Sequence, residues 1–150
     1  MQQLKGEIAQ QVAGLVSGEP DLIANLSNVS ALLNDYLSDI NWVGFYIMRA
    51  GELVLGPFQG KVACIRIPVG RGVCGTAAAT KETQRIDDVH AFPGHIACDS
   101  ASNSELVVPI IVNGNVVAVL DIDSPKYARF TVEVQQEIEA VVKVLEGLNW

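Results

Sequence analysis

The three cysteines are the residues of this chain best suited to redox chemistry. Cys64, Cys74 and Cys98 make an odd number at irregular spacings, which is not the pattern of a secreted disulfide framework. In a reducing compartment, a cysteine is either an inert core residue or a reactive thiol, whose thiolate form is the nucleophile. The surroundings of each cysteine in the chain therefore decide which interpretation it favours.

Each cysteine lies in a different kind of segment. Cys98 lies in an aperiodic stretch between His95 and Asp99, and a long loop in a compact domain is usually functional. Cys64 lies in the run VACIRI, which by itself is typical of a buried strand residue. Cys74 comes near the start of a short helix, where the helix N-terminus would lower the pKa of a thiol. Its small neighbours equally suit a packing position.

Two aspartates mark the end of an apolar strand. Asp121 and Asp123 occupy alternate positions, so their side chains point to the same face if the strand continues through them. Carboxyl groups that share a pocket repel one another, and at least one pKa then rises enough to give a proton donor near neutral pH. The alternative is a pair of solvated caps, because Asp-x-Asp before Ser-Pro is also a common way to leave a sheet.

Two aromatic residues share a face of another predicted strand. Trp42 and Tyr46 are four residues apart, so they point the same way. They are suited to form the apolar wall of a ligand site, and ordinary core packing explains them equally well.

A zinc site is conceivable from His90, His95, Cys98 and the other cysteines. The chain has none of the close Cys-x2-Cys pairs that usually hold zinc, so we expect no metal. His95 is interpreted as a loop residue.

The spacing of apolar residues predicts the elements that must position these side chains. Helices are expected over residues 4–17, about 22–38 and 131–147, with a short helix in VCGTAAAT; strands over 41–48, 53–56, 61–67, 105–112 and 116–122; and a long loop over 87–104. This order indicates an α+β fold, with one antiparallel sheet and the N- and C-terminal helices packed on one face.

Composition and charge exclude several classes of function. The 150 residues are 49% hydrophobic and 18% charged, which is typical of a folded chain, and we expect a single domain over 1–150. The net charge of -7 opposes contact with nucleic acid. The longest uncharged stretch, 106–120, is broken by Pro109, and the polar first residues do not form a secretory signal. We therefore expect a cytoplasmic protein that does not associate with membranes.

Longer motifs resemble a known family. The stretches IPVGRGVCGTAAATKETQRIDDV and SELVVPIIVNGNVVAVLDIDS resemble the GAF domain, whose strands and Gly-rich turn close over a small-molecule pocket. More narrowly, the chain is similar to the free methionine-(R)-sulfoxide reductases in WVGFY at 42–46, GPFQGKVACIRI at 56–67, GVCG at 72–75, HIACDSASNSE at 95–105 and DIDSP at 121–125. These motifs contain all three cysteines.

The resemblance implies an enzyme that reduces free L-methionine-(R)-sulfoxide to methionine through a cysteine sulfenic acid and then a disulfide, recycled by thioredoxin. It implies Cys98 as the catalytic cysteine, Cys64 as the main resolving cysteine and Cys74 as a second thiol. The implied substrate site contains Trp42, Tyr46, Glu105, Asp121 and Asp123, with no cofactor. GAF helices often pair between subunits, so we expect a homodimer, although the same apolar stripes could instead cover the sheet.

The position of Glu105 tests this reading of the site. A strict two-residue turn at Asn113-Gly114 would place Glu105 opposite Ile122, on the face away from the two aspartates. A longer turn or a bulge would pair Glu105 with Asp123. Because the resemblance groups the three acids around substrate, we expect the second arrangement.

The main alternative is a non-catalytic GAF module that binds a ligand or senses redox state. The fold alone would not distinguish it from an enzyme. A cyclic-nucleotide pocket must satisfy a phosphate, and a pocket rich in acids would repel that charge. The cysteines and acids together favour the reductase.

Overall fold

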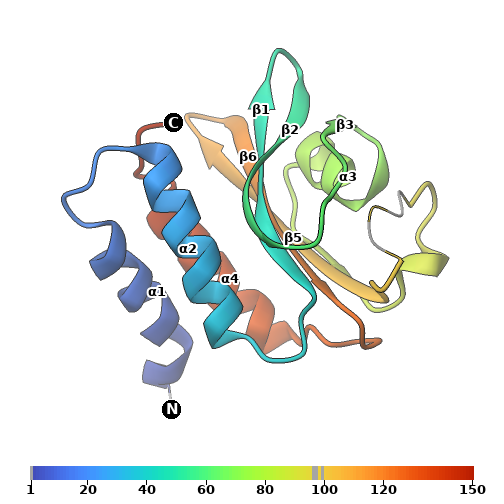
Figure 1. Ribbon diagram of the computed structural model, residues 1–150, viewed down its shortest axis with the longest axis horizontal. Helices are drawn as coiled ribbons and strands as arrows, with labels where there is room; N and C mark the ends of the chain where they lie inside the picture. Colours follow the sequence, from blue (N-terminus) through green and yellow to red (C-terminus); the bar gives the residue numbers. More distant parts are fainter. Residues whose placement is uncertain (1, 96–97, 99) are drawn as a thin grey trace.

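Six strands form one sheet in which every neighbouring pair is antiparallel (Figure 1). The computed structural model describes residues 2–95, 98 and 100–150. The strands, in the sheet order β3-β2-β1-β6-β5-β4, are β3 Arg66–Pro68, β2 Glu52–Gly60, β1 Trp42–Arg49, β6 Asn115–Ser124, β5 Ser104–Val112 and β4 Gln84–Ile86. The helices are α1 Gln2–Val16, α2 Leu22–Tyr36, α3 Gly72–Thr80 and α4 Val132–Leu145, with a 3-10 turn at Val89–Ala91.

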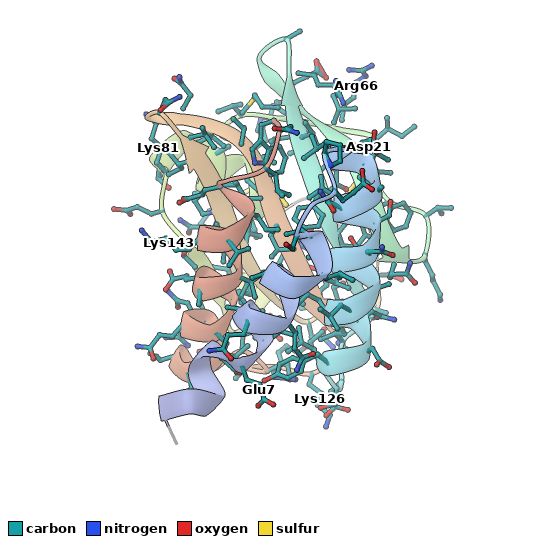
Figure 2. All side chains as sticks on the ribbon, turned by 90° about the vertical axis from the view of Figure 1, so that its left-hand side faces the viewer. Glu7, Asp21, Arg66, Lys81, Lys126 and Lys143 are labelled. Atoms are coloured by element: carbon teal, nitrogen blue, oxygen red, sulfur yellow. A yellow bond between two sulfur atoms is a disulfide. The ribbon has the colours of Figure 1, made fainter. Side chains whose placement is uncertain are left out.

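Helices α2 and α4 pack on one face of the sheet, and α1 packs on these two helices (Figure 1); Figure 2 shows all three in front of the sheet. The apolar stripes of α2 and α4, which include Leu33 and Val141, are buried in one core with alternate strand residues such as Phe45 and Leu120, and Val12 of α1 extends this core. Burial of this apolar surface is the main driving force for the packing. The predicted α+β fold with terminal helices on one face is confirmed, and the stripes are used to cover the sheet.

Side-chain oxygens cap two of these helices at the predicted starts. Asp21 accepts a hydrogen bond from the Ala24 amide at 2.8 Å, and Thr131 accepts one from the Val134 amide at 3.2 Å. Each cap satisfies an amide that has no partner inside its helix. Among the described residues, no helix has both the length and the apolar character needed to cross a membrane.

The opposite face of the sheet carries a second, smaller core. Helix α3 packs there, with Val73, Cys74 and Ala77 buried against the strands. Residues of β1 that alternate with the first core, Trp42 and Tyr46, face this side. The two cores separate the structural face of the sheet from the face that holds the candidate site.

The strand predicted over 61–67 is present only at its end, as β3, because residues 61–65 form a loop. Strand β2 is longer than predicted and runs to Gly60, and the chain then forms a loop before the three-residue strand β3. Two aromatic side chains donate hydrogen bonds to backbone carbonyl groups of this loop. In a strand, such carbonyl groups would pair with a neighbouring strand. Trp42 Nε1 donates to the Lys61 carbonyl at 3.1 Å, and the Tyr46 hydroxyl donates to the Cys64 carbonyl at 2.9 Å.

Strand β4 was not predicted. Its three residues pair with Glu105–Val107 of β5, and a segment this short gives no measurable alternation of apolar residues. β4 ends at Ile86, so the long loop expected from residue 87 begins directly after the edge strand of the sheet.

The β5–β6 hairpin confirms the expected register of Glu105. Its turn has two residues, Asn113 and Gly114, both with positive φ, as such turns require. An irregularity between Ile110 and Ile111 shifts the pairing by one residue. Glu105 therefore lies opposite Asp123. Without this bulge, the two-residue turn would place Glu105 opposite Ile122.

Candidate active site

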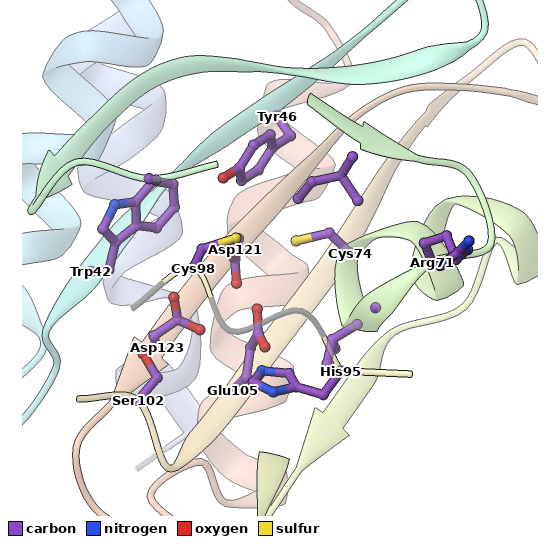
Figure 3. A pocket seen from close by; sticks show the side chains of 14 residues that line it. Trp42, Tyr46, Arg71, Cys74, His95, Cys98, Ser102, Glu105, Asp121 and Asp123 are labelled. Atoms are coloured by element: carbon purple, nitrogen blue, oxygen red, sulfur yellow. The ribbon is translucent and has the colours of Figure 1, made fainter. Parts of the chain in front are cut away.

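Three central strands place the predicted site residues around one cavity (Figure 3). Trp42 lies opposite Asp123 across β1 and β6, and Glu105 lies opposite Asp123 across β5 and β6. Asp121 is two residues from Asp123 and therefore on the same face. With Tyr46, all five predicted substrate residues line the cavity.

The acids of the cavity are buried, which changes their ionisation. Glu105 is 7% exposed and Asp121 is 5% exposed. Burial raises the pKa of Glu105 well above its usual value, and the nearby Asp121 and Asp123 charges raise it further. Burial also raises the pKa of Asp121, although hydrogen bonds from Glu105 and Cys74 oppose that rise. Glu105 thus holds its proton more tightly than an ordinary glutamate does.

Cys74 is buried in the first turn of α3 and turned toward two of the acids. Its Sγ and one carboxylate oxygen each of Glu105 and Asp121 lie within 4.8 Å of one another. Burial raises the pKa of the Cys74 thiol well above its usual value, and the charge of Asp121 adds to the effect. Burial and the neighbouring acids therefore favour a packing role for Cys74 over a reactive thiol.

The Cys74, Glu105 and Asp121 side chains are also close enough together to contact one bound cation. Oδ1 of Asp121 is buried and has no hydrogen-bond partner among the described residues. An acid-rich, partly unsatisfied cavity suits a positively charged group such as an ammonium.

Cys64 and Cys98 form a disulfide, with their Cα atoms 5.4 Å apart. The bond joins the loop after β2 to the segment before β5, across 34 residues of sequence. Cys98 lines the cavity, while Cys64 lies just outside it in a partly exposed position. Cys64 is thus not the buried strand residue that its local sequence indicates.

The aromatic residues form one wall of the cavity. Trp42 stacks on Tyr46 with ring centroids 5.9 Å apart and on Phe58 at 5.1 Å. Burial raises the pKa of the Tyr46 hydroxyl, as does the charge of Asp121, so the hydroxyl stays protonated and donates to the backbone carbonyl of Cys64. This aromatic wall therefore also fixes the backbone at Cys64, one of the two disulfide cysteines.

Three cavity residues with polar side chains have no role in the sequence-based site: Arg71, His95 and Ser102. His95 is three residues before Cys98, which is a usable signal, and its pKa is lowered by burial and by His90. Arg71 stands in the Gly-rich turn before α3, where a basic residue next to free helix amides suits an anion. Ser102 gives no signal that separates it from other serines of the loop.

Proteins of known name or structure are similar to most of this chain. A GAF domain family model matches residues 21–146. The chain is 58% identical over 132 residues to the free methionine-R-sulfoxide reductase of Escherichia coli, covering 88% of this chain and 80% of that protein. It is 49% identical over 153 residues to the enzyme of the same name from Saccharomyces cerevisiae, covering 94% and 85%. The solved structure of the Neisseria meningitidis free methionine-R-sulfoxide reductase in complex with its substrate superposes with a TM-score of 0.92 at 44% identity, covering 96% and 87%.

Proposed function

The chain belongs to the GAF domain family and, within it, to the free methionine-R-sulfoxide reductases, and from this premise we propose the residues and steps of its reaction. It is an oxidoreductase. The proposed substrate is free L-methionine-(R)-sulfoxide, and the proposed nucleophile is Cys98. The observation that carries the proposal is the Cys64–Cys98 disulfide, of which Cys98 lines an acid-rich cavity.

In the first step, the Cys98 thiolate attacks the sulfoxide sulfur. A carboxyl group supplies a proton to the oxygen as its bond to the methionine sulfur breaks. The oxygen passes to the Cys98 sulfur as the bond that the attack formed between the two sulfur atoms breaks. Methionine sulfur gains two electrons, Cys98 sulfur loses two, and Cys98 is left as a sulfenic acid. Glu105 is the proposed proton donor, because burial and the neighbouring acids keep its carboxyl group protonated.

In the second step, the Cys64 thiol attacks the sulfenic acid sulfur. A disulfide forms, and the oxygen leaves as water. The Cα separation of 5.4 Å supports Cys64 as the resolving cysteine. Cys74 is proposed as a supporting thiol, because it is buried beside Asp121 and takes no part in the disulfide.

The cavity is suited to the two charged ends of a free amino acid. Asp121 and Asp123 would receive the ammonium group, and the Trp42 ring would contact the methyl sulfoxide end. The carboxylate would lie toward Arg71 and the first amides of α3. A polypeptide lacks one or both of these charges, which favours the free substrate.

Regeneration of the thiols requires an external dithiol. We propose thioredoxin, which transfers two electrons by thiol–disulfide exchange. A cycle of this kind is suited to the reducing cytoplasm, and we also propose a homodimer, for which the exposed side chains of Leu15 and Ile23 on the helical side offer apolar surface.

The test is methionine release from free L-methionine-(R)-sulfoxide with dithiothreitol as reductant. We expect turnover by the wild type and none by Cys98→Ser. Cys64→Ser should keep turnover with dithiothreitol, which can reduce a sulfenic acid directly, and lose it with thioredoxin. A wild type that has reduced thiols and releases no methionine would refute the proposal and favour a ligand-binding module.

A further inference from the structure

The loop that carries Cys64 exposes apolar side chains to solvent. Val62 is 88% exposed and Ile65 is 66% exposed, the two highest values among the large exposed hydrophobic residues of the described chain. Val69, just after β3, is 41% exposed. Single exposed hydrophobic residues are ordinary, but a group of them beside a disulfide indicates a binding surface.

The backbone of this loop is held so that these side chains stay outside. Trp42 and Tyr46 bind the carbonyl groups of Lys61 and Cys64, and the Leu55 amide donates to the Ile65 carbonyl at 2.8 Å. The loop is thus fixed at both ends and in register with β2. Turning Val62 or Ile65 inward would break these hydrogen bonds.

The same segment is basic in an acidic chain. Residues 61–71 contain Lys61, Arg66 and Arg71 and no acid, whereas the whole chain has a net charge of -7. Arg66 forms an exposed ion pair with Glu52 at 3.4 Å, which leaves Lys61 and Arg71 as the cations without a partner carboxylate within 4.0 Å among the described residues. An apolar surface with a basic border is complementary to a partner with an apolar, acidic face.

We propose that Val62, Ile65 and Val69 form the docking surface for a dithiol protein that reduces the disulfide by attack on Cys64. This inference rests on the proposed function, which requires such a reductant. The incoming thiolate is proposed to attack the sulfur of Cys64 and not that of Cys98. Cys98 lines the cavity, whereas Cys64 lies outside it, beside the exposed apolar side chains of its own loop.

The exchange then runs in two balanced steps. A thiolate of the partner attacks Sγ of Cys64, the bond between Cys64 and Cys98 breaks, and Cys98 leaves as a thiolate. The second thiol of the partner loses its proton and attacks the mixed disulfide, which releases the Cys64 thiolate. The partner ends as a disulfide, having supplied two electrons.

The experiment compares two reductants on the full-length protein. The double variant Val62→Ser/Ile65→Ser is assayed with thioredoxin, thioredoxin reductase and NADPH, and separately with dithiothreitol, which needs no docking surface. We expect the KM for thioredoxin to rise roughly tenfold, as for loss of a small apolar contact patch, with dithiothreitol turnover unchanged. Val132→Ser, an exposed residue at the start of α4, is the matched control and should change neither rate.

A second measurement identifies the attacked sulfur atom. Thioredoxin that lacks its second cysteine should form a mixed disulfide with Cys64 of the oxidised protein, and peptide mapping locates it. Attachment at Cys98, or unchanged thioredoxin kinetics in the double variant, would overturn the inference. A change of oligomeric mass without a change in thioredoxin kinetics would assign the surface to a second copy of the chain, which also overturns it.

The mixed-disulfide assay needs no sulfoxide substrate. It therefore separates failure of the docking surface from failure of the proposed function, which would appear as an inactive wild type with both reductants.

Discussion

Replacing Glu105 with glutamine should change how the stability of the protein depends on pH. The carboxyl group of Glu105 lies within 4.8 Å of Asp121 at their nearest donor atoms. Two unit charges at that separation repel by roughly 3.5 kcal/mol at an effective dielectric constant of about 20. Burial and this repulsion both raise the pKa of Glu105 in the folded chain, so it keeps its proton where the unfolded chain has lost it.

The sign of the effect follows from that direction. Stability due to a raised pKa is fully present below the unfolded pKa and is lost as pH rises through the folded pKa. For one group, the free energy of unfolding falls by about 1.4 kcal/mol per pH unit in this interval, or up to about 2.7 kcal/mol from about pH 5.5 to about pH 7.5. Glu105→Gln keeps the shape of the protonated acid and removes its titration.

Urea unfolding of the disulfide form at several pH values measures this loss. The wild type should lose stability relative to Glu105→Gln as pH rises, by an amount up to that limit, while the variant loses reductase activity because it cannot supply the proton. Glu82→Gln, at an exposed position, is the control and should follow the wild type. Parallel stability curves for the wild type and Glu105→Gln would refute the idea that Glu105 is protonated in the folded chain.

Three further substitutions test the fold and the third cysteine. Gly44→Ala should destabilise the protein by about 1–3 kcal/mol in urea unfolding, because the added Cβ would overlap Phe58 on β2; a change below about 0.5 kcal/mol would contradict this. Ser124→Ala should cost about 1–3 kcal/mol by the same assay, since its buried hydroxyl donates to the Asp39 carbonyl at 2.6 Å; an unchanged midpoint would show that the bond contributes nothing. Cys74→Ser should keep dithiothreitol-driven turnover within about threefold, because the buried thiol is protonated; complete loss would make it part of the reaction.

The parts of the fold that follow from periodicity were predictable from the sequence. The helical stripes and the Asn113-Gly114 turn depend on near neighbours in the chain, and the structure confirms them. The loop at 61–65 was not predictable, because its carbonyl groups are bound by Trp42 and Tyr46, which lie about 20 residues away in sequence. Alternation of apolar residues alone made that loop resemble a strand.

Some features of the candidate site were also predictable from the sequence, and others were not. The common face of Asp121 and Asp123 follows from strand geometry, and the resemblance to a family of known chemistry motivated the expected position of Glu105. The state of Cys74 could not be read from the chain, because opposite effects on its pKa arise from the helix N-terminus and from burial. Only the packing of α3 against the acids decides between them.

The disulfide that closes the candidate site also constrains the unfolded chain. It joins residues 34 apart, and cross-linking a loop of that length lowers the conformational entropy of the unfolded ensemble enough to add about 4 kcal/mol to stability. The enclosed segment includes β4 as well as β3 and α3, and residues of β3 and α3 line one side of the cavity. Each transfer of two electrons to the disulfide therefore converts a resistant fold into one that unfolds more readily, and resistance to heat or protease reports the oxidation state of the molecule.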